Sequence, residues 1–212
     1  MRKLSLFLVV TVLSTVILSF SSCEKRKLEK LQDLIFEGSS PCDLLGDYDE
    51  SDFYGLYMTQ EENGVILYFD TDANGDCSFV VSGPALTFIE WGCKGVTVNN
   101  NGTADSDVIA LNQLIIDNTA CTDIPETIPY LMQASVYENE PAYLPTIEMY
   151  QTQYDNLVAS GKYDESDFRN EFAWTCVEED ADNAWAFNKA TGEAKVFPKD
   201  TELEVLPMVF LD

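Results

Sequence analysis

The chain has 212 residues, of which 12 are Lys or Arg, 37 are Asp or Glu and none is His, so its formal net charge is −25. Because Lys and Arg contacts to phosphate dominate affinity for nucleic acid, we expect no binding to DNA or RNA. The absence of histidine excludes Ser-His-Asp and Cys-His triads and histidine-ligated zinc. An apolar content of 46% with 12% aromatic residues indicates a folded domain.

The first residues have the order of an export signal. Arg2 and Lys3 form a short positive segment, residues 4–20 form an apolar core, and the small residues of the Ser-Ser-Cys sequence at 21–23 follow. This segment resembles the lipobox of bacterial lipoproteins, with Phe20 at the position where Leu is usual. In that family the leader is cut off just before the cysteine, which is then lipidated.

The resemblance implies that residues 1–22 are a signal peptide and that Cys23 carries palmitate or similar acyl chains. The protein would then be held on a bacterial envelope membrane, expected to be the outer membrane, with the side that it faces left open. Two alternatives remain: an ordinary leader cut nearby, for instance after Ser21, and an uncleaved anchor. An anchor needs about 17–25 mostly apolar residues, and residues 4–20 are just long enough.

The segment after the cysteine is basic, and the rest of the chain is acidic. Residues 23–41 are expected to be a lipid-anchored tether with a short helix over 24–36, whose apolar face is Leu28, Leu31 and Ile35. The cations of this segment, Lys25, Arg26, Lys27 and Lys30, should lie against anionic lipid head groups. Residues 31–212 contain six cationic and 35 acidic residues, so the body should be repelled from the same membrane.

A six-residue sequence, Tyr-Asp-Glu-Ser-Asp-Phe, occurs at both 48–53 and 163–168. It predicts a helix start, because the first Asp can act as N-cap and the second can reach back as in a capping box. The second copy fits this prediction better, with a helix that opens at Asp164 and includes Phe168, Phe172 and Cys176. One interpretation of the two hexamers is that the domain is a duplicated module, with halves of about 42–125 and 126–212.

The remaining patterns predict an α+β domain over 42–212, built of antiparallel β hairpins or a meander with a helical hairpin in the C-terminal half. Two hairpins are expected, Val65–Asp70 with Cys77–Val81 and Ala184–Asn188 with Ala194–Phe197. The first helix of the helical hairpin covers residues 147–158. Further strands are expected at 85–92, 95–98, 108–111, 114–116 and 203–211, the last an edge strand interrupted at Pro207.

One loop has the ligand types of a metal site. Oxygen-bearing side chains stand at loop positions 1, 3, 5 and 7, namely Asp70, Asp72, Asn74 and Asp76. Glycine at position 6 resembles the opening of the EF-hand calcium loop, but position 12 is Val81 in place of the bidentate Glu. A plain Asx-Gly hairpin turn selects the same residues, and acidic residues 178–182 are expected to be a solvated loop. No other cofactor is expected.

Five cysteines follow Cys23, namely Cys42, Cys77, Cys93, Cys121 and Cys176, and they allow at most two disulfides, whose pairing the spacing does not determine. Trp91, Trp174 and Trp185 favour a core, with a sugar-stacking platform as the alternative. We therefore expect a lipid-anchored, non-enzymatic binding or structural domain. The alternatives are a glycan-binding or paired-carboxylate glycan-hydrolysing lipoprotein and a calcium-dependent adhesion module.

Overall fold

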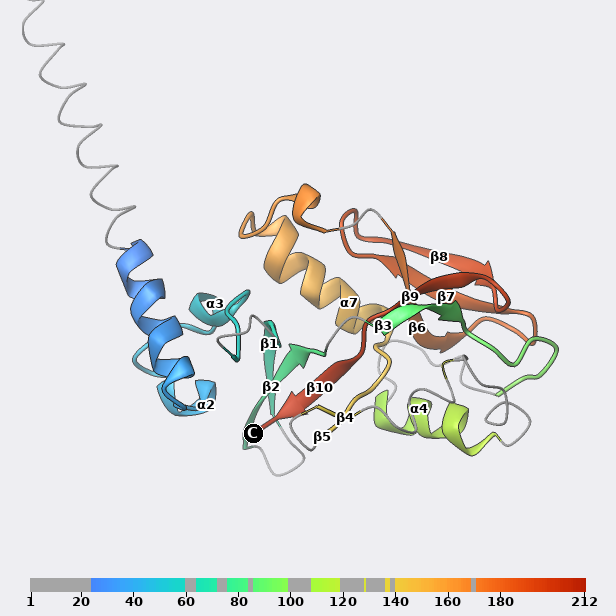
Figure 1. The fold of residues 1–212 in the computed structure, drawn as a ribbon, viewed down its shortest axis with the longest axis horizontal. Coiled ribbons are helices and arrows are strands. Elements are labelled where there is room, and N and C mark those ends of the chain that lie inside the picture. The colour runs from blue at the N-terminus through green and yellow to red at the C-terminus, as the bar shows by residue number, and fades with distance from the viewer. Residues whose placement is uncertain are drawn as a thin grey trace, which may run out of the picture.

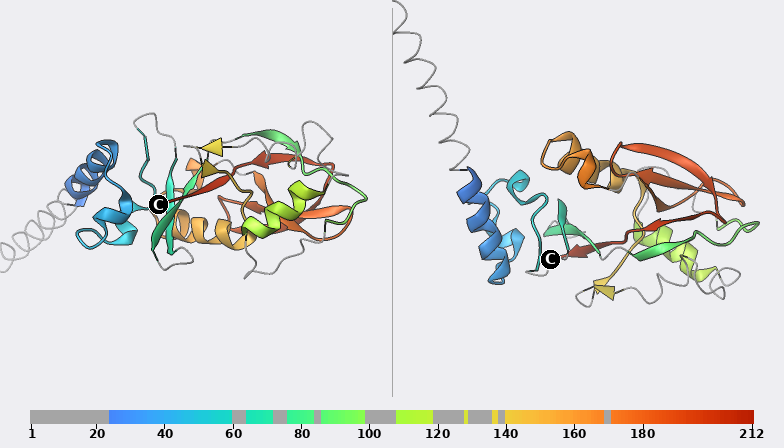
Figure 2. Two further views of the ribbon diagram at one scale, coloured as in Figure 1. Left: turned by 90° about the horizontal axis from the view of Figure 1, so that it is seen from below. Right: turned by 45° about the horizontal axis from the view of Figure 1, so that its top comes forward.

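The structure, a computed structural model, describes residues 24–59, 64–71, 76–83, 86–98, 108–118, 128, 136–137, 140–168 and 171–212. Its helices and mainly antiparallel sheets confirm the expected α+β class. Figures 1 and 2 show the N-terminal helix at one end of the molecule and a five-stranded sheet at the other. Within the described residues, no helix is both long enough and apolar enough to cross a membrane.

The N-terminal helix occupies residues 24–36 and packs on the body through Leu31 and Ile35, as its periodicity predicts. Two one-turn helices follow, α2 (Pro41–Leu44) and α3 (Glu50–Phe53). The Oγ of Ser40 caps α2 by accepting from the backbone N–H of Cys42 at 3.2 Å. This cap satisfies one of the backbone N–H groups that the first turn of α2 leaves without a helical partner.

A three-stranded antiparallel sheet, with strand order β1-β2-β10, lies next to these helices (Figure 1). Strands β1 (Ile66–Thr71) and β2 (Cys77–Ser82) form the first predicted hairpin, which is confirmed. Strand β10 (Met208–Leu211) comes from the end of the chain and pairs with β2. The first hairpin therefore closes its sheet with the last strand.

The larger sheet has five strands in the order β3-β9-β6-β7-β8. Their bounds are β3 (Leu86–Glu90), β6 (Phe172–Glu178), β7 (Asn183–Asn188), β8 (Glu193–Pro198) and β9 (Glu202–Val205). The β7–β8 hairpin is as predicted, and only the β6–β9 pairing in this sheet is parallel among the described strands. A further described pair joins β4 (Val136–Tyr137) to β5 (Glu140–Pro141).

Pro207 breaks the predicted strand 203–211 into β9 and β10, which belong to different sheets. The expectation of an edge strand holds for β10 but is wrong for β9, which lies between β3 and β6. Proline is confined to edges because it lacks a backbone donor, but Pro207 stands outside both strands. It therefore leaves the hydrogen bonds of β9 intact.

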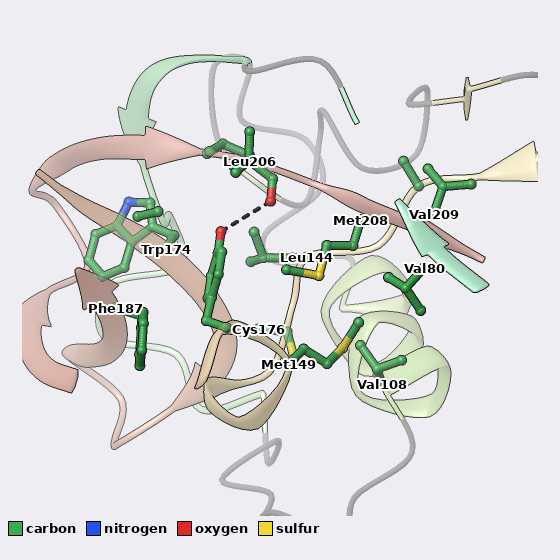
Figure 3. Packing of buried hydrophobic residues seen from close by; sticks show 14 of the residues in the cluster. Val80, Val108, Leu144, Met149, Trp174, Cys176, Phe187, Leu206, Met208 and Val209 are labelled. Atoms are coloured by element: carbon green, nitrogen blue, oxygen red, sulfur yellow. Dashed lines mark hydrogen bonds between the residues drawn. The ribbon is translucent and has the colours of Figure 1, made fainter. Parts of the chain in front are cut away.

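Helix α7 (Ile147–Tyr154) continues as one π-helical segment, Asp155–Ala159, so the helix predicted at 147–158 is confirmed. It crosses the five-stranded sheet, and the ring of Tyr150 stacks on Phe187 with centroids 5.6 Å apart. The Tyr150 hydroxyl donates to the Leu206 carbonyl at 3.1 Å (Figure 3). Burial together with a satisfied hydroxyl makes this aromatic pair a centre of the core.

The short strands predicted at 108–111 and 114–116 are wrong, because this segment is one helix, α4 (Val108–Asp117). Its buried residues, Val108, Leu111, Asn112 and Ile115, have helical spacing. The Asn112 amide donates to the Leu144 carbonyl and accepts from the Leu144 N–H, both at 2.9 Å. Asn112, which lies between the two strands predicted here, is thus a hydrogen-bonded core residue. The strand predicted at 95–98 is also absent from this described segment.

The second helix of the predicted helical hairpin is wrong as well. After the π-helical segment, the described residues contain one turn of 3₁₀ helix, Glu165–Asp167, and β6 begins at Phe172. Strand β6 is flanked by β9 and β7, so nearly all of its residues are buried on both faces. A continuous apolar run of this kind does not distinguish a central strand from a buried helix by periodicity.

The chain segments that contain the two hexamers contact each other. In the first copy Asp52 Oδ2 accepts from the Asp49 N–H at 2.9 Å, so the capping box forms here and the expectation that the second copy fits better is wrong. The hydroxyl of Tyr163, in the second copy, donates to the Gly55 carbonyl at 2.8 Å. Each of the two larger sheets combines strands from the first and the second half of the chain. Duplication of a module remains a prediction.

Candidate functional site

The predicted lipidation residue, Cys23, lies outside the described residues, as do Asp72 and Asn74 of the predicted calcium loop. The other two loop ligands, Asp70 and Asp76, are exposed at the facing ends of β1 and β2. Val81, at loop position 12, is buried inside β2. Among the described residues no group of three or more Cys, Asp or Glu gathers in a way that could hold a metal ion, and calcium binding stays a prediction.

The tryptophans are divided between core and surface. Trp91 and Trp174 are fully buried, and their indole N–H groups donate to the carbonyls of Thr175 and Ile89 at 2.9 and 3.0 Å. Trp185 is half-buried and donates to Glu179 at 2.7 Å. A sugar stacks on an accessible aromatic face, so of the three only Trp185 has the exposure for it.

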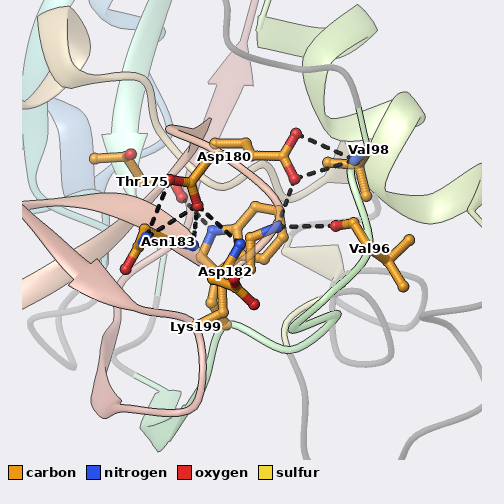
Figure 4. Close-up of polar contacts among 9 residues, drawn as sticks. Val96, Val98, Thr175, Asp180, Asp182, Asn183 and Lys199 are labelled. Atoms are coloured by element: carbon orange, nitrogen blue, oxygen red, sulfur yellow. Dashed lines mark hydrogen bonds and ion pairs between the residues drawn. The ribbon is translucent and has the colours of Figure 1, made fainter.

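The most concentrated chemistry in the described residues is a buried ion pair. The ammonium of Lys199, after β8, lies 2.5 Å from Glu178 Oε1 at the end of β6, and their side chains are 0% and 1% exposed (Figure 4). The ammonium also donates to the Val96 carbonyl at 3.1 Å. Both oxygens of Glu178 accept from the Val98 N–H at 3.1 Å. Each charge therefore has a partner besides the other, which a buried pair requires.

An aromatic ring completes the surroundings of this pair. The Lys199 ammonium lies 4.7 Å from the centroid of Trp91, a cation–π distance. Backbone bonds hold the same elements together: Gly92 donates to the Lys199 carbonyl at 3.2 Å, and Lys199 N–H donates to the Asp182 carbonyl at 2.9 Å. The pair thus fastens the segment 91–98 onto the five-stranded sheet.

Sequence reasoning missed this pair, because it assigned residues 178–182 to a solvated loop. That prediction holds for Asp180, whose exposed carboxylate accepts from the backbone N–H groups of Asp182 and Asn183, both at 2.8 Å. These bonds, with Asp182 first, hold the pKa of Asp180 below its ordinary value. The prediction is wrong for Glu178, which ends a buried strand. No local signal links Glu178 to Lys199, because only the sheet brings them together.

A second ion pair, Lys189 with Glu204 at 2.6 Å, belongs to the same sheet but lies toward the opposite end of β6, and both side chains are 9% exposed. Burial, followed by the negative charge of Glu204, raises the pKa of Tyr150 well above its ordinary value. Catalytic acids, bases and nucleophiles must reach their substrate. A substrate cannot reach the buried Glu178–Lys199 pair, so we assign this pair a role in stabilising the fold.

The structure shows which of the described cysteines form disulfides. Cys42 and Cys77 form a disulfide that ties α2 to β2, with 5.9 Å between their Cα atoms, and Cys93 is also disulfide-bonded. Cys121 lies outside the described residues. Cys176 is a buried thiol whose pKa is raised by burial, so it stays protonated and is a poor nucleophile.

Comparison with known proteins adds no relative to these observations. No family model matches the chain, and no curated protein sequence matches it. The α+β fold and the two buried ion pairs are therefore described from this chain alone.

Proposed function

We propose that the protein is a lipid-anchored protein of the bacterial cell envelope, attached through acyl chains on Cys23. The folded domain then has a non-catalytic binding or structural role at the membrane surface. The leader supports this proposal, because residues 1–23 have the order of charge, apolar core and small residues that precedes a lipidated cysteine.

The observation that carries the proposal is the combination of this leader with the Cys42–Cys77 disulfide. Disulfides form and persist in exported proteins, whereas cytosolic thiols are kept reduced. The disulfide lies at the N-terminal end of the body, so it strengthens the end of the domain that an anchor would hold. The outer membrane is the expected destination.

Metabolic labelling with an alkyne analogue of palmitate tests the proposal directly. We expect the wild-type chain to take up label and to enter the detergent phase of a cloud-point separation. The Cys23→Ser variant should take up no label and keep its leader. The control Cys176→Ala changes another cysteine, which is buried, and should be labelled like the wild type.

Fractionation of the envelope on a density gradient tests the destination. The labelled protein should sediment with the outer membrane. An unlabelled wild-type chain, or label that persists in Cys23→Ser, would show that Cys23 is not the site of attachment. Sedimentation with the inner membrane would leave the anchor in place and overturn only the destination.

A further inference from the structure

The N-terminal helix (residues 24–36) is a docked part of the body. Leu31 and Ile35 are 0% and 3% exposed, so its apolar face is buried. The Gln32 side chain donates to the Tyr57 carbonyl at 2.7 Å and accepts from the Tyr57 N–H at 3.0 Å. These contacts fix the direction of the helix relative to the domain.

The cations of this helix divide into two groups. Lys27 faces the body, where its ammonium lies 2.5 Å from Asp52 Oδ2 and 5.6 Å from the ring centroid of Tyr48. Lys25, Arg26 and Lys30 are exposed, and Lys25 has only a 4.0 Å contact with Glu29. We call these three residues the basic end.

Each of the other described cations has a partner within the domain, and some of them are exposed. Lys189 and Lys199 are in buried ion pairs, and Lys94 is paired with Asp200 at 2.5 Å. Lys162 donates to the carbonyls of Ser51 and Tyr54, and Lys195 lies 5.2 Å from the ring centroid of Phe197. In the part of the chain that the structure describes, exposed positive charge without a close partner in the domain is therefore concentrated at the basic end.

The position of this charge is unfavourable for the helix itself. If the leader is removed before Cys23, Lys25 and Arg26 stand in the first turn, where the helix dipole is positive and cations are destabilising. An anionic surface at that end would offset the unfavourable interaction. The acyl chains of the proposed anchor would be attached to the residue that directly precedes the helix.

We propose that the basic end, Lys25, Arg26 and Lys30, binds anionic phospholipid head groups and so fixes the orientation of the domain on the membrane. This inference rests on the proposed function. Because the N-terminal helix is docked, the contact sets the direction of the whole body. Figures 1 and 2 show the β7–β8 hairpin at the end opposite the helix, so it would face away from the bilayer.

The test uses the mature chain from Cys23, with one tetradecyl chain attached chemically to the Cys23 thiol. A single acyl chain gives only marginal, reversible membrane binding, so a contribution from charge becomes measurable. Partition is measured by sedimentation with vesicles of phosphatidylcholine, with and without phosphatidylglycerol. Peptide masses confirm that only Cys23 is modified.

Two charge-matched variants are compared, each lacking two lysines: Lys25→Gln with Lys30→Gln, and Lys94→Gln with Lys195→Gln. Each cation near an anionic surface contributes about fivefold to the partition constant, so the first variant should bind phosphatidylglycerol vesicles about 25-fold more weakly. The second should match the unsubstituted chain. On pure phosphatidylcholine all three should bind equally.

Equal losses for the two variants on phosphatidylglycerol would show that total charge matters and not the basic end, which would overturn the inference. Unchanged binding of the first variant would overturn it too. Because the alkyl chain is added chemically, these outcomes are independent of whether cells acylate Cys23. Failure of the labelling experiment is thus distinguishable from failure of the head-group contact.

Discussion

The two ends of this molecule are stabilised in different ways. The N-terminal end, made of the helix 24–36, α2 and α3, has little secondary structure beyond that helix and depends on the Cys42–Cys77 disulfide. The five strands of the sheet at the other end contain no disulfide cysteine, although Cys93, just after β3, is disulfide-bonded, and two buried ion pairs lie there among large aromatic residues. The short elements of the N-terminal end are held together by a covalent bond, whereas the strands of the larger sheet are held to one another by hydrogen bonds and burial.

This difference indicates which interactions stabilise each end of the molecule against unfolding. One-turn helices bury too little apolar surface to offset the entropy of ordering the chain, so a disulfide acts there mainly by restricting the unfolded chain. Charges buried in the sheet are costly to leave unpaired. The sheet should therefore be sensitive to the loss of one charge, and the N-terminal end to reduction.

The largest expected effect comes from Lys199→Met. It leaves the carboxylate of Glu178 buried without its partner, and we expect a loss of about 3–5 kcal/mol in the free energy of unfolding. Urea denaturation followed by tryptophan fluorescence measures this loss. The double variant Lys199→Met with Glu178→Leu removes both charges and should recover most of it. A single-variant loss below about 1 kcal/mol would contradict the assigned role.

The disulfide should have the next largest effect. Replacing Cys42 and Cys77 by Ser should lower the free energy of unfolding by about 2–4 kcal/mol, because the closed loop spans 35 residues. We expect limited proteolysis to cleave first near residues 37–48 in this variant. Cleavage that begins instead in β6–β8 would show that the disulfide supports the whole domain and would remove the contrast between the two ends.

Gly55→Ala tests the contact between Tyr163 of the second hexamer and the residues that follow the first hexamer. Gly55 has φ +87°, and an added Cβ would lie 2.6 Å from Cε2 of Tyr163. Gly46→Ala is the matched control, because Gly46 also has positive φ, +105°, but has nothing within 4 Å of an added Cβ. Backbone strain should cost about 1–2 kcal/mol in both, and Gly55→Ala should cost more. Equal losses of stability in the two variants, measured by thermal denaturation, would mean that the Tyr163 side chain moves away from the added Cβ at little cost.

The smallest effect is expected at the exposed pair Lys94–Asp200, which serves as the surface counterpart of the buried pair. The hydrogen bond from Lys94 lowers the pKa of Asp200 below its ordinary value of 3.8. A lowered carboxyl pKa stabilises the folded state above the unfolded-state pKa, and this contribution is lost as the pH falls through the folded-state pKa.

Asp200→Asn should therefore slightly flatten the decline of stability below pH 3.8 and leave neutral-pH stability nearly unchanged. Urea titrations at several pH values, with and without added salt, measure this. Salt should remove the difference, because both side chains are about half exposed. A large, salt-resistant loss at neutral pH would show that the pair behaves like the buried one.

Particular elements show how far the sequence could predict the fold. The β1–β2 and β7–β8 hairpins were predictable because short runs of strand-forming residues flank Gly-containing turns, and the N-terminal helix because its apolar residues repeat at helical spacing. Helix α4 was missed because Asn112 interrupts its apolar pattern, and the contact that satisfies Asn112 comes from Leu144. Strand β6 was missed because a run buried on both faces has no period.

The candidate sites divide in the same way. Cys23 and the loop Asp70–Asp76 were identified from spacing alone, and they remain predictions because part or all of each lies outside the described residues. The Glu178–Lys199 pair could not have been found from the sequence. Its two residues come from different elements, and β6, the end of β8 and the segment 91–98 must assemble before either charge is buried.

By itself, the sequence determined the acidic character of the body, the basic segment after the leader and the elements defined by local periodicity. These follow from composition and from neighbours within a few residues. The tertiary structure decided which charges are buried, which strand is central and which hexamer copy caps a helix. Those properties depend on contacts between residues distant in the chain, where removal from water, rather than local propensity, sets the free energy.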